Sequence, residues 1–314
     1  MLFDRPFIQA YPTIKDYNTR PDTHCRLEGG LRVRGEFQKK SVGSKPLVSI
    51  VTVVFNGVKN IEQTIQSVLN QTYDNIEYII IDGGSTDGTL DIIRKYEDVI
   101  DYWASESDNG IYDAMNKGIA LAAGELINLL NADDFLEPAA VKLVTGRYLQ
   151  YKKSCILYGH SYSIDDVHSV KARMFSSTKY WLGMTINHQT MFVHREIYTT
   201  LGLYDSKEYR YAADFDFLVR CFRNNVSFIR IEDCIVNYRN AGISSAGSDH
   251  RKEANSINKK YFCFLSGKRV AFVIFNYIWM PFKINLKMSL YKTVGAKTVR
   301  KAITIYKSLS NEKN

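Results

Sequence analysis

Short apolar runs alternate with segments of helical periodicity through the first half of the chain. Residues 48–55, 76–81 and 126–130 are nearly unbroken apolar runs, and each ends in a polar turn. Between them, apolar residues recur three or four positions apart, the spacing typical of an amphipathic helix. The predicted strands are 48–55, 76–81, 100–104 and 126–130, and the predicted helices are 61–69, 89–96 and 111–122. This alternation predicts βαβ units and a parallel sheet buried on both faces.

The pattern becomes mixed after about residue 155, where strands are predicted over 156–158, 189–193 and 227–238 and a helix over 212–224. Residues 1–45 show no clear periodicity, and we interpret them as an irregular N-terminal arm. One α/β domain is expected over 46–245, with halves 46–135 and 136–245, followed by a C-terminal region over 246–314.

Four polar clusters follow the predicted parallel strands, at 56–57, 82–88, 106–110 and 131–134. The carboxyl ends of parallel strands meet at one edge of a sheet, and open α/β sheets bind ligands at that edge. A single polar turn would be weak evidence, because turns are generally polar. Four such turns at one edge predict a ligand crevice.

Paired acids, Asp133 and Asp134, come directly after the apolar run 126–130. Carboxylates held close together repel each other and resist burial unless a cation compensates their charge. The pair therefore indicates a hard divalent metal and a phosphate-bearing substrate. The alternative is an Asp-rich turn that caps a helix opened by Pro138.

Asp82 follows the apolar run 76–81 and precedes two glycines. A carboxylate at this position can accept hydrogen bonds from a base or a ribose, and the glycines allow close backbone approach. The alternative is that Asp82 only caps its own turn. The chain contains neither G-x-G-x-x-G after its first strand nor a P-loop motif, which disfavours dinucleotide and P-loop classes.

The net charge of +8 is unevenly distributed. Residues 251–314 hold 14 Lys and Arg against two Glu, so the preceding 250 residues carry a net negative charge. Residues 270–282 have no charge, but 13 residues are too few to span a bilayer, and Pro281 interrupts them. Basic residues mixed with interfacial aromatics predict a helical, amphipathic region attracted to an anionic membrane surface.

The basic C-terminal region has two alternative interpretations. It can be a helix packed on the domain with a solvated basic face, although charges of one sign favour the membrane. It can also bind nucleic acid, but no nucleic-acid module accompanies it, so no nucleic-acid partner is expected.

The composition, 45% apolar and 24% charged, is that of an ordinary globular protein. The five cysteines form no C-x-x-C pair, so neither a zinc site nor a disulfide framework is indicated. The N-terminus shows no signal-peptide pattern. We therefore expect a cytoplasmic protein, peripheral on the cytoplasmic face of the membrane.

Three segments together resemble inverting family 2 glycosyltransferases of the GT-A fold. They are VSIVTVVFN at 48–56, IIIDGGSTDGT at 79–89 and LNADD at 130–134. The segment SESDNGIYDAMNKG at 105–118 is similar to the branch that builds bacterial surface polysaccharides. The resemblance covers about residues 46–240 and implies a Rossmann-like, mostly parallel sheet with helices on both faces. It would make 46–135 the nucleotide-sugar-binding half and 136–245 the acceptor half.

The resemblance implies a metal-dependent enzyme of hexosyltransferase type with a nucleotide-sugar donor and Mn²⁺ or Mg²⁺. A uracil base is expected, with thymine and guanine as alternatives, and the acceptor would be a lipid-linked oligosaccharide. Val53 would offer backbone contacts to the base, and Asp82 would read it. The D-x-D motif falls on Asn131 and Asp133, so its first acid is an amide here. The implied donor-binding residues are Val53, Asn56, Asp82, Asp108, Asn131 and Asp133, and the implied metal ligands are Asp133, Asn131 and His188.

The catalytic base of the family matches Asp214, at the start of the predicted helix 212–224. Inverting transfer needs a carboxylate that removes the acceptor's proton. The alternative for Asp214 is a helix-capping acid. Asp216 would face nearly the opposite side of that helix. His188, Gln189 and Asp216 are the residues expected on the acceptor side.

Two more functions are compatible with the sequence. A nucleotidyltransferase would share the nucleotide-binding half, but it would normally carry a Gly-rich basic loop after the first strand, where this chain has NGVK at 56–59. A non-catalytic nucleotide-sugar-binding protein is favoured by the amide at Asn131. Asp133, Asp134 and Asp214 together argue against it.

Overall fold

The computed structural model describes residues 11–18, 26–165, 170–174, 176, 184–239 and 248–262. One compact unit extends to Ile257, and a second runs from Asn258 to Asn314. In chain order, the elements are α1 (Ile14–Asn18), β1 (Leu27–Gly29), β2 (Val48–Val54), α2 (Ile61–Leu69), β3 (Ile76–Asp82), α3 (Thr89–Lys95), β4 (Tyr102–Ser105), α4 (Ile111–Leu121), β5 (Leu126–Asn131), β6 (Phe135–Leu136), α5 (Ala140–Tyr151), β7 (Cys155–Asp165), β8 (Val170–Met174), η2 (His188–Thr190), β9 (Met191–His194), α6 (Arg195–Leu201), α7 (Ala213–Arg223), β10 (Ser227–Arg239) and α8 (Ser248–Phe262).

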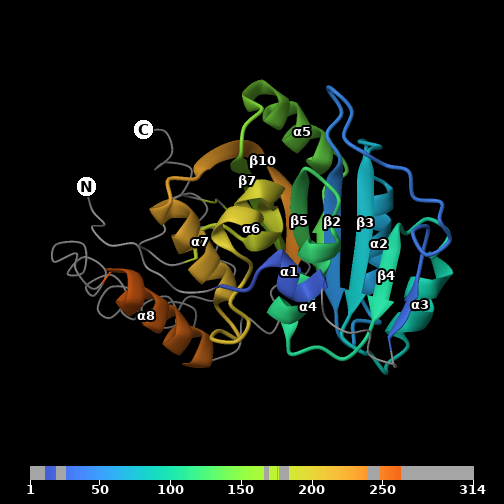
Figure 1. Cartoon of the computed structure of the whole chain (residues 1–314), viewed down its shortest axis with the longest axis horizontal. Coiled ribbons are helices and arrows are strands. Elements are labelled where there is room, and N and C mark those ends of the chain that lie inside the picture. The colour runs from blue at the N-terminus through green and yellow to red at the C-terminus, as the bar shows by residue number, and fades with distance from the viewer. Residues whose placement is uncertain are drawn as a thin grey trace. The chain divides into compact units, whose positions relative to one another are not determined.

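A sheet of ten strands, counted over the described residues, runs through the first unit in the order β1-β4-β3-β2-β5-β9-β7-β10-β6, with β8 paired to β7 (Figure 1). The four strands β4, β3, β2 and β5 are parallel. The parallel α/β core predicted from the sequence is therefore confirmed. Beyond β5 the sheet is mixed, because β9 is antiparallel to both β5 and β7.

Helices cover both faces of the parallel strands. Residues of β2 and β3 are buried at every position. Ile50 and Ile80 belong to a core cluster that includes Ile61 and Ile65 of α2. The opposite face receives α4, which contacts β2 and β3. Burial on both faces explains why these strands are nearly continuous apolar runs rather than alternating ones.

The N-terminal segment, predicted as an irregular arm, contains α1 and β1. β1 pairs antiparallel with β4, so it forms an edge of the sheet. Arg32 extends from the turn after β1 and forms an ion pair with the buried Glu77 of β3. Three residues cannot show a strand period, which is why the pattern predicted no element here.

Several predicted strand boundaries differ from the structure, and the strand predicted over 156–158 runs from Cys155 to Asp165. The sequence pattern predicts a strand over 189–193, whereas Gln189 and Thr190 belong to the 3₁₀ turn η2 and the strand begins at Met191. The cause is Asn128 in the centre of β5. Its side-chain amide donates to the carbonyl oxygens of Gln189 (2.8 Å) and Met191 (2.9 Å), which holds the chain in a turn there.

Two predictions fall outside the described residues. They are the domain boundary between residues 245 and 246 and, beyond residue 262, the amphipathic character of the C-terminal region 246–314. In the described part of the chain, no helix is both long and apolar enough to cross a membrane.

A substitution at Gly118 of α4 tests how closely this helix packs on the sheet. A Cβ atom at Gly118 would lie 2.1 Å from Cγ1 of Val51. We expect Gly118→Ala to lower the free energy of unfolding by about 1–3 kcal/mol, because an extra methyl group in a packed core forces strain. Urea unfolding measures the change.

Gly146 of α5 provides the matched control. It is exposed, and a Cβ atom there would meet nothing within 4 Å. Gly146→Ala should raise the free energy of unfolding by about 1 kcal/mol, since alanine is the better helix former. Equal effects of the two substitutions would contradict the close packing of α4.

Candidate active site

The carboxyl ends of the parallel strands bring several predicted site residues to one edge of the sheet. Val53 of β2 lies in register with Asn131 of β5, and Asp82 of β3 lies in register with Val54 and Ser105. This is the edge at which open α/β sheets bind ligands.

Asp214 lies in the first turn of α7 and faces this edge. Its Oδ1 accepts hydrogen bonds from the hydroxyl of Tyr112 (2.9 Å) and from the backbone N–H of Phe215 (2.8 Å). Its Oδ2 lies 3.2 Å from Nδ1 of His188. The side chains of Asp214 and His188 are each 13% exposed. Three segments far apart in the sequence therefore hold one carboxylate.

These contacts decide the ionisation of Asp214. Burial by itself would raise the pKa of Asp214, but the hydrogen bonds and charge of His188 and the hydroxyl of Tyr112 outweigh it, so the pKa is lowered. The carboxylate is therefore ionised at neutral pH. An ionised, partly accessible carboxylate beside a ligand crevice can accept a proton.

His188 connects Asp214 to the end of β5. Its Nε2 lies 3.4 Å from Oδ1 of Asn131, while its Nδ1 faces Asp214. The hydrogen bonds from Asn128 to Gln189 and Met191 fix the turn that carries His188. The structure thus brings together three residues that the sequence predicted, namely Asn131, His188 and Asp214.

Asp134 is fully buried and has a structural role. Its carboxylate accepts hydrogen bonds from the side-chain amide of Gln189 (2.8 Å) and the backbone N–H of Arg239 (2.9 Å). Burial raises the pKa of Asp134 well above its usual value, and the charge of Asp133 adds to this. The alternative of an acid capping the following helix is wrong for Asp134, because both of its oxygens bind other segments.

Asp133, in contrast, is half-buried at the crevice. Burial raises the pKa of Asp133, and the positive charge of Arg239 opposes this rise. The guanidinium of Arg239 donates to the carbonyl oxygen of Asp133 (2.6 Å). Arg239 therefore puts a positive charge beside the D-x-D position.

The described residues contain no group of three His, Cys, Asp or Glu side chains that would hold a metal ion by themselves. Asp133 and Asn131 offer carboxylate and amide oxygens, the ligand type that Mg²⁺ and Mn²⁺ prefer. Magnesium is commonly bound by one or two carboxylates together with substrate phosphates. The residues present fit a metal ion shared with a phosphate-bearing substrate.

Asp82 is fully buried and already has three hydrogen bonds. It accepts from the backbone N–H of Ser85 (3.0 Å), from the Ser85 hydroxyl and from the Ser105 hydroxyl (2.6 Å). Asp82 thus caps its own turn, which is one of the two roles expected from the sequence. Its surface is fully covered, so Asp82 acts here through the turn that it holds.

Asn56 and Asp108 form hydrogen bonds in the loops that follow β2 and β4. Asn56 has a left-handed backbone (φ 51°), and its Oδ1 accepts from the backbone N–H of Thr86 (2.9 Å). Asp108 accepts from the backbone N–H of Gly110 (2.8 Å), and burial raises the pKa of Asp108. A Cβ atom on Gly83 would lie 2.6 Å from Oδ2 of Asp108, so a larger residue at position 83 would displace the Asp108 side chain.

Two further predicted site residues, Val53 and Asp216, form contacts within the protein. The carbonyl oxygen of Val53 accepts from the backbone N–H of Ala132 (3.2 Å). Asp216 is fully buried and forms an ion pair with Arg220 (2.8 Å). The structure therefore does not bring Asp216 into the group around Asp214.

Sequence reasoning missed four residues of this site: Phe55, Tyr112, Asn128 and Arg239. Phe55 is 65% exposed at the end of β2, although it ends an otherwise buried apolar run. A large exposed aromatic directly before a polar turn was the available signal for Phe55. The contacts of Tyr112 and Arg239 depend on partners about one hundred residues away. No local pattern reports such contacts.

The family model described as Glycosyl transferase family 2 matches residues 49–204. A PGL/p-HBAD biosynthesis glycosyltransferase from Mycobacterium tuberculosis is 32% identical over 200 residues, which cover 61% of this chain and 75% of the relative. An uncharacterized glycosyltransferase from Haemophilus influenzae is 28% identical over 240 residues, covering 68% and 72% respectively.

Two solved structures share the fold at low sequence identity. Staphylococcus aureus TarS in complex with UDP-GlcNAc aligns with a TM-score of 0.55 and 15% identity over 68% of this chain and 65% of that one. The mannosyltransferase PcManGT from Pyrobaculum calidifontis, in complex with GDP-Man and Mn²⁺, aligns with a TM-score of 0.52 and 15% identity over 96% and 86%.

Proposed function

This chain belongs to glycosyl transferase family 2, and we propose that it transfers a sugar, with inversion, from a uridine diphosphate sugar to a hydroxyl of a lipid-linked glycan. Glycosyltransferase activity follows from the family. The observation that supports inverting transfer is the arrangement around Asp214. An ionised carboxylate, oriented by Tyr112 and His188, stands beside Asn131 at the ligand-binding edge of the sheet.

The donor is a nucleotide diphosphate sugar in this proposal. TarS has been solved with UDP-GlcNAc and PcManGT with GDP-Man, which supports this class of donor. We assign the base to the crevice between β2 and β3. The exposed ring of Phe55 offers a stacking surface there, and Asn56 and Asp108 belong to the adjoining loops. Stacking on a base is worth roughly 1–3 kcal/mol.

The transfer itself is a single displacement. The acceptor oxygen forms a bond to the anomeric carbon, and the bond from that carbon to the diphosphate oxygen breaks. The acceptor proton passes to Asp214, and the nucleoside diphosphate leaves with the electron pair of the broken bond. Attack opposite the leaving group inverts the anomeric configuration. His188 lines the acceptor side in this assignment, whereas the side chain of Gln189, also expected there, is buried against Asp134.

The departing diphosphate carries negative charge that the site must offset. Arg239 supplies one positive charge beside Asp133. Asp133 and Asn131 would hold Mn²⁺ or Mg²⁺ together with the diphosphate. The bound ion would stabilise the charge that develops on the leaving group.

Release of the nucleoside diphosphate tests the donor and the metal together. A panel of UDP- and GDP-sugars should give release with a UDP-sugar in Mn²⁺, and EDTA should stop it. Asp133→Asn should abolish metal-dependent turnover because it removes the carboxylate that we assign to the metal ion and the diphosphate. Asn131→Asp serves as the control and should keep activity. Full activity of the wild type in EDTA would disprove the metal role.

Substitutions of Asp214 and Asp216 in α7 test whether Asp214 is the catalytic base. Asp214→Asn should keep donor binding but lower kcat by on the order of 10²–10⁴, the usual share of general-base catalysis. Asp216→Asn should instead lower thermal stability, because it removes the negative charge that is paired with the buried Arg220. Wild-type kcat in folded Asp214→Asn would show that another group takes the proton.

The lowered pKa of Asp214 adds a pH signature to this test. A carboxylate with a pKa below its ordinary value stays ionised above about pH 4. Titration of Asp214 should therefore not reduce kcat between about pH 8 and pH 5. Activity that depends on Asp214 should be lost only as the pH falls through its lowered pKa.

We assign the acceptor to the membrane surface. The M. tuberculosis relative is named for PGL/p-HBAD biosynthesis, which is compatible with a role in surface polysaccharide synthesis. The basic residues of 251–314 would attract anionic lipid at about 1 kcal/mol each. Full-length protein should float with anionic vesicles in low salt and detach in high salt. Absence of binding in low salt would contradict peripheral membrane attachment.

A further inference from the structure

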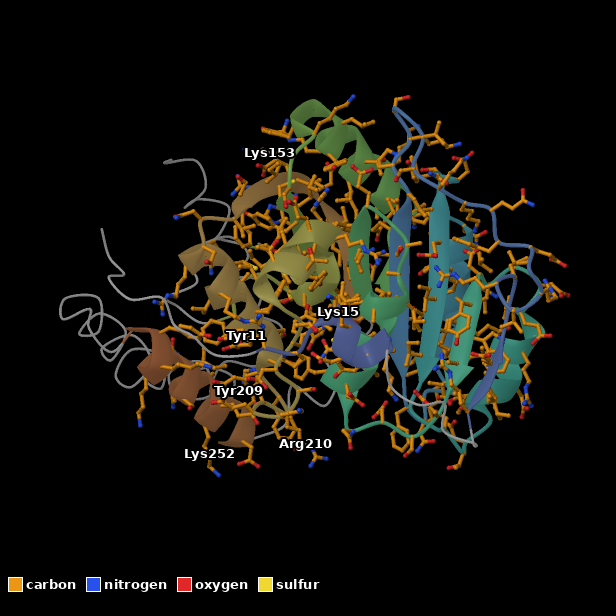
Figure 2. The ribbon with its side chains drawn as sticks, in the orientation of Figure 1. Tyr11, Lys15, Lys153, Tyr209, Arg210 and Lys252 are labelled. Carbon is orange, nitrogen blue, oxygen red and sulfur yellow. The ribbon has the colours of Figure 1, made fainter. Side chains whose placement is uncertain are left out.

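Glu253 of α8 holds the segment that leads into α7. Its carboxylate accepts hydrogen bonds from three consecutive backbone N–H groups, those of Arg210 (3.0 Å), Tyr211 (2.8 Å) and Ala212 (3.0 Å). Figure 2 labels Arg210, which precedes α7, and Lys252, the neighbour of Glu253 on α8. A carboxylate bound by successive backbone N–H groups is a strong, charge-assisted arrangement.

This contact holds the chain directly ahead of α7, which has no side-chain N-cap. Ala212 is the N-cap residue of α7, and its side chain cannot accept a hydrogen bond. A negative charge near a helix N-terminus is favourable because it offsets the positive end of the helix dipole. Glu253 brings that charge from a helix that begins 34 positions after Asp214 in the sequence. The start of α7 is therefore set by a residue outside α7.

Asp214 follows Ala212 by two positions, so the same contact determines where the base stands. The opposite side of Asp214 meets Tyr112 at 2.9 Å and His188 at 3.2 Å. A shift of the 210–212 segment would move Asp214 relative to these two partners. Proton transfer requires hydrogen-bond reach, and a misplacement of 1 Å can cost about 10²-fold in rate.

We propose that Glu253 is a positioning residue for glycosyl transfer, which sets the place of Asp214 by holding the backbone of residues 210–212. This inference rests on the proposed role of Asp214 as the base. Glu253 does not touch the reacting groups. It acts only through the backbone that carries Asp214.

Kinetics of Glu253→Ala test the proposal. kcat should fall by on the order of 10- to 100-fold, since the base is displaced. Donor affinity, measured by calorimetry, should stay within about twofold, because the donor residues lie on β2, β3 and β5. Glu253→Gln should retain part of kcat, since its amide oxygen still accepts from the backbone. A folded Glu253→Ala protein with wild-type kcat, or with donor affinity lost in step with kcat, would overturn the proposal.

Asp249→Asn is the matched control. Asp249 is an acid on the same helix, 61% exposed and paired with Lys252. Its substitution removes the same charge from α8 and should leave kcat unchanged. If Glu253→Ala fails to fold, Glu253→Gln supplies the same two readouts. A loss in Asp249→Asn as large as that in Glu253→Gln would indicate a general charge effect and reject the positioning role.

A double-mutant cycle separates positioning from mere stabilisation. In an Asp214→Asn background, Glu253→Gln should lower kcat no further, because there is no base left to position. Additive losses would refute the proposal. If Asp214→Asn lowers kcat while Glu253→Ala keeps the wild-type kcat, the positioning role of Glu253 is rejected and the proposed function stands. Absence of nucleotide release by the wild type would reject the proposed function and this inference with it.

Amide hydrogen exchange gives a readout that does not depend on turnover. The N–H groups of residues 210–212 should exchange more slowly in the wild type than in Glu253→Gln, because the carboxylate holds all three. Equal exchange in the two proteins would show that Glu253 does not hold this segment in solution.

Discussion

The site depends on one buried carboxylate, that of Asp134. Taking a carboxylate out of water is costly unless hydrogen bonds replace its hydration. Asp134 meets this requirement with the side chain of Gln189 and the backbone of Arg239, so the end of β5 is tied to η2 and to the end of β10. This tie turns Asp133 toward the crevice and brings the guanidinium of Arg239 back to the carbonyl of Asp133.

A second set of contacts builds the proton acceptor on this frame. His188 opens the turn η2 that precedes β9, and it links Asn131 to Asp214. Tyr112, at the start of α4, supplies another hydrogen bond to Asp214. The donor edge and the base therefore belong to one hydrogen-bonded network. A change at either end of that network alters the geometry of the other.

Adjacent acids in this protein have different roles, and burial separates them. Asp133 and Asp134 are neighbours in sequence, yet the first faces the crevice and the second joins three segments. Asp214 and Asp216 both lie in the first turn of α7, but Asp216 is buried in an ion pair with Arg220. Residue type identified these acids as candidates. Only their partners assign a role to each.

The sequence by itself determined the parallel core, the polar turns at its carboxyl edge and the positions of Asn131, His188 and Asp214 as candidates. Period and strand–turn order are local properties, and a βαβ unit follows from them. The tertiary structure decided what periodicity does not encode. It paired β1 with the edge strand, set Tyr112 against Asp214 and placed Glu253 against residues 210–212. These contacts join segments distant in the chain, and they form because buried polar groups must find partners wherever the fold brings them.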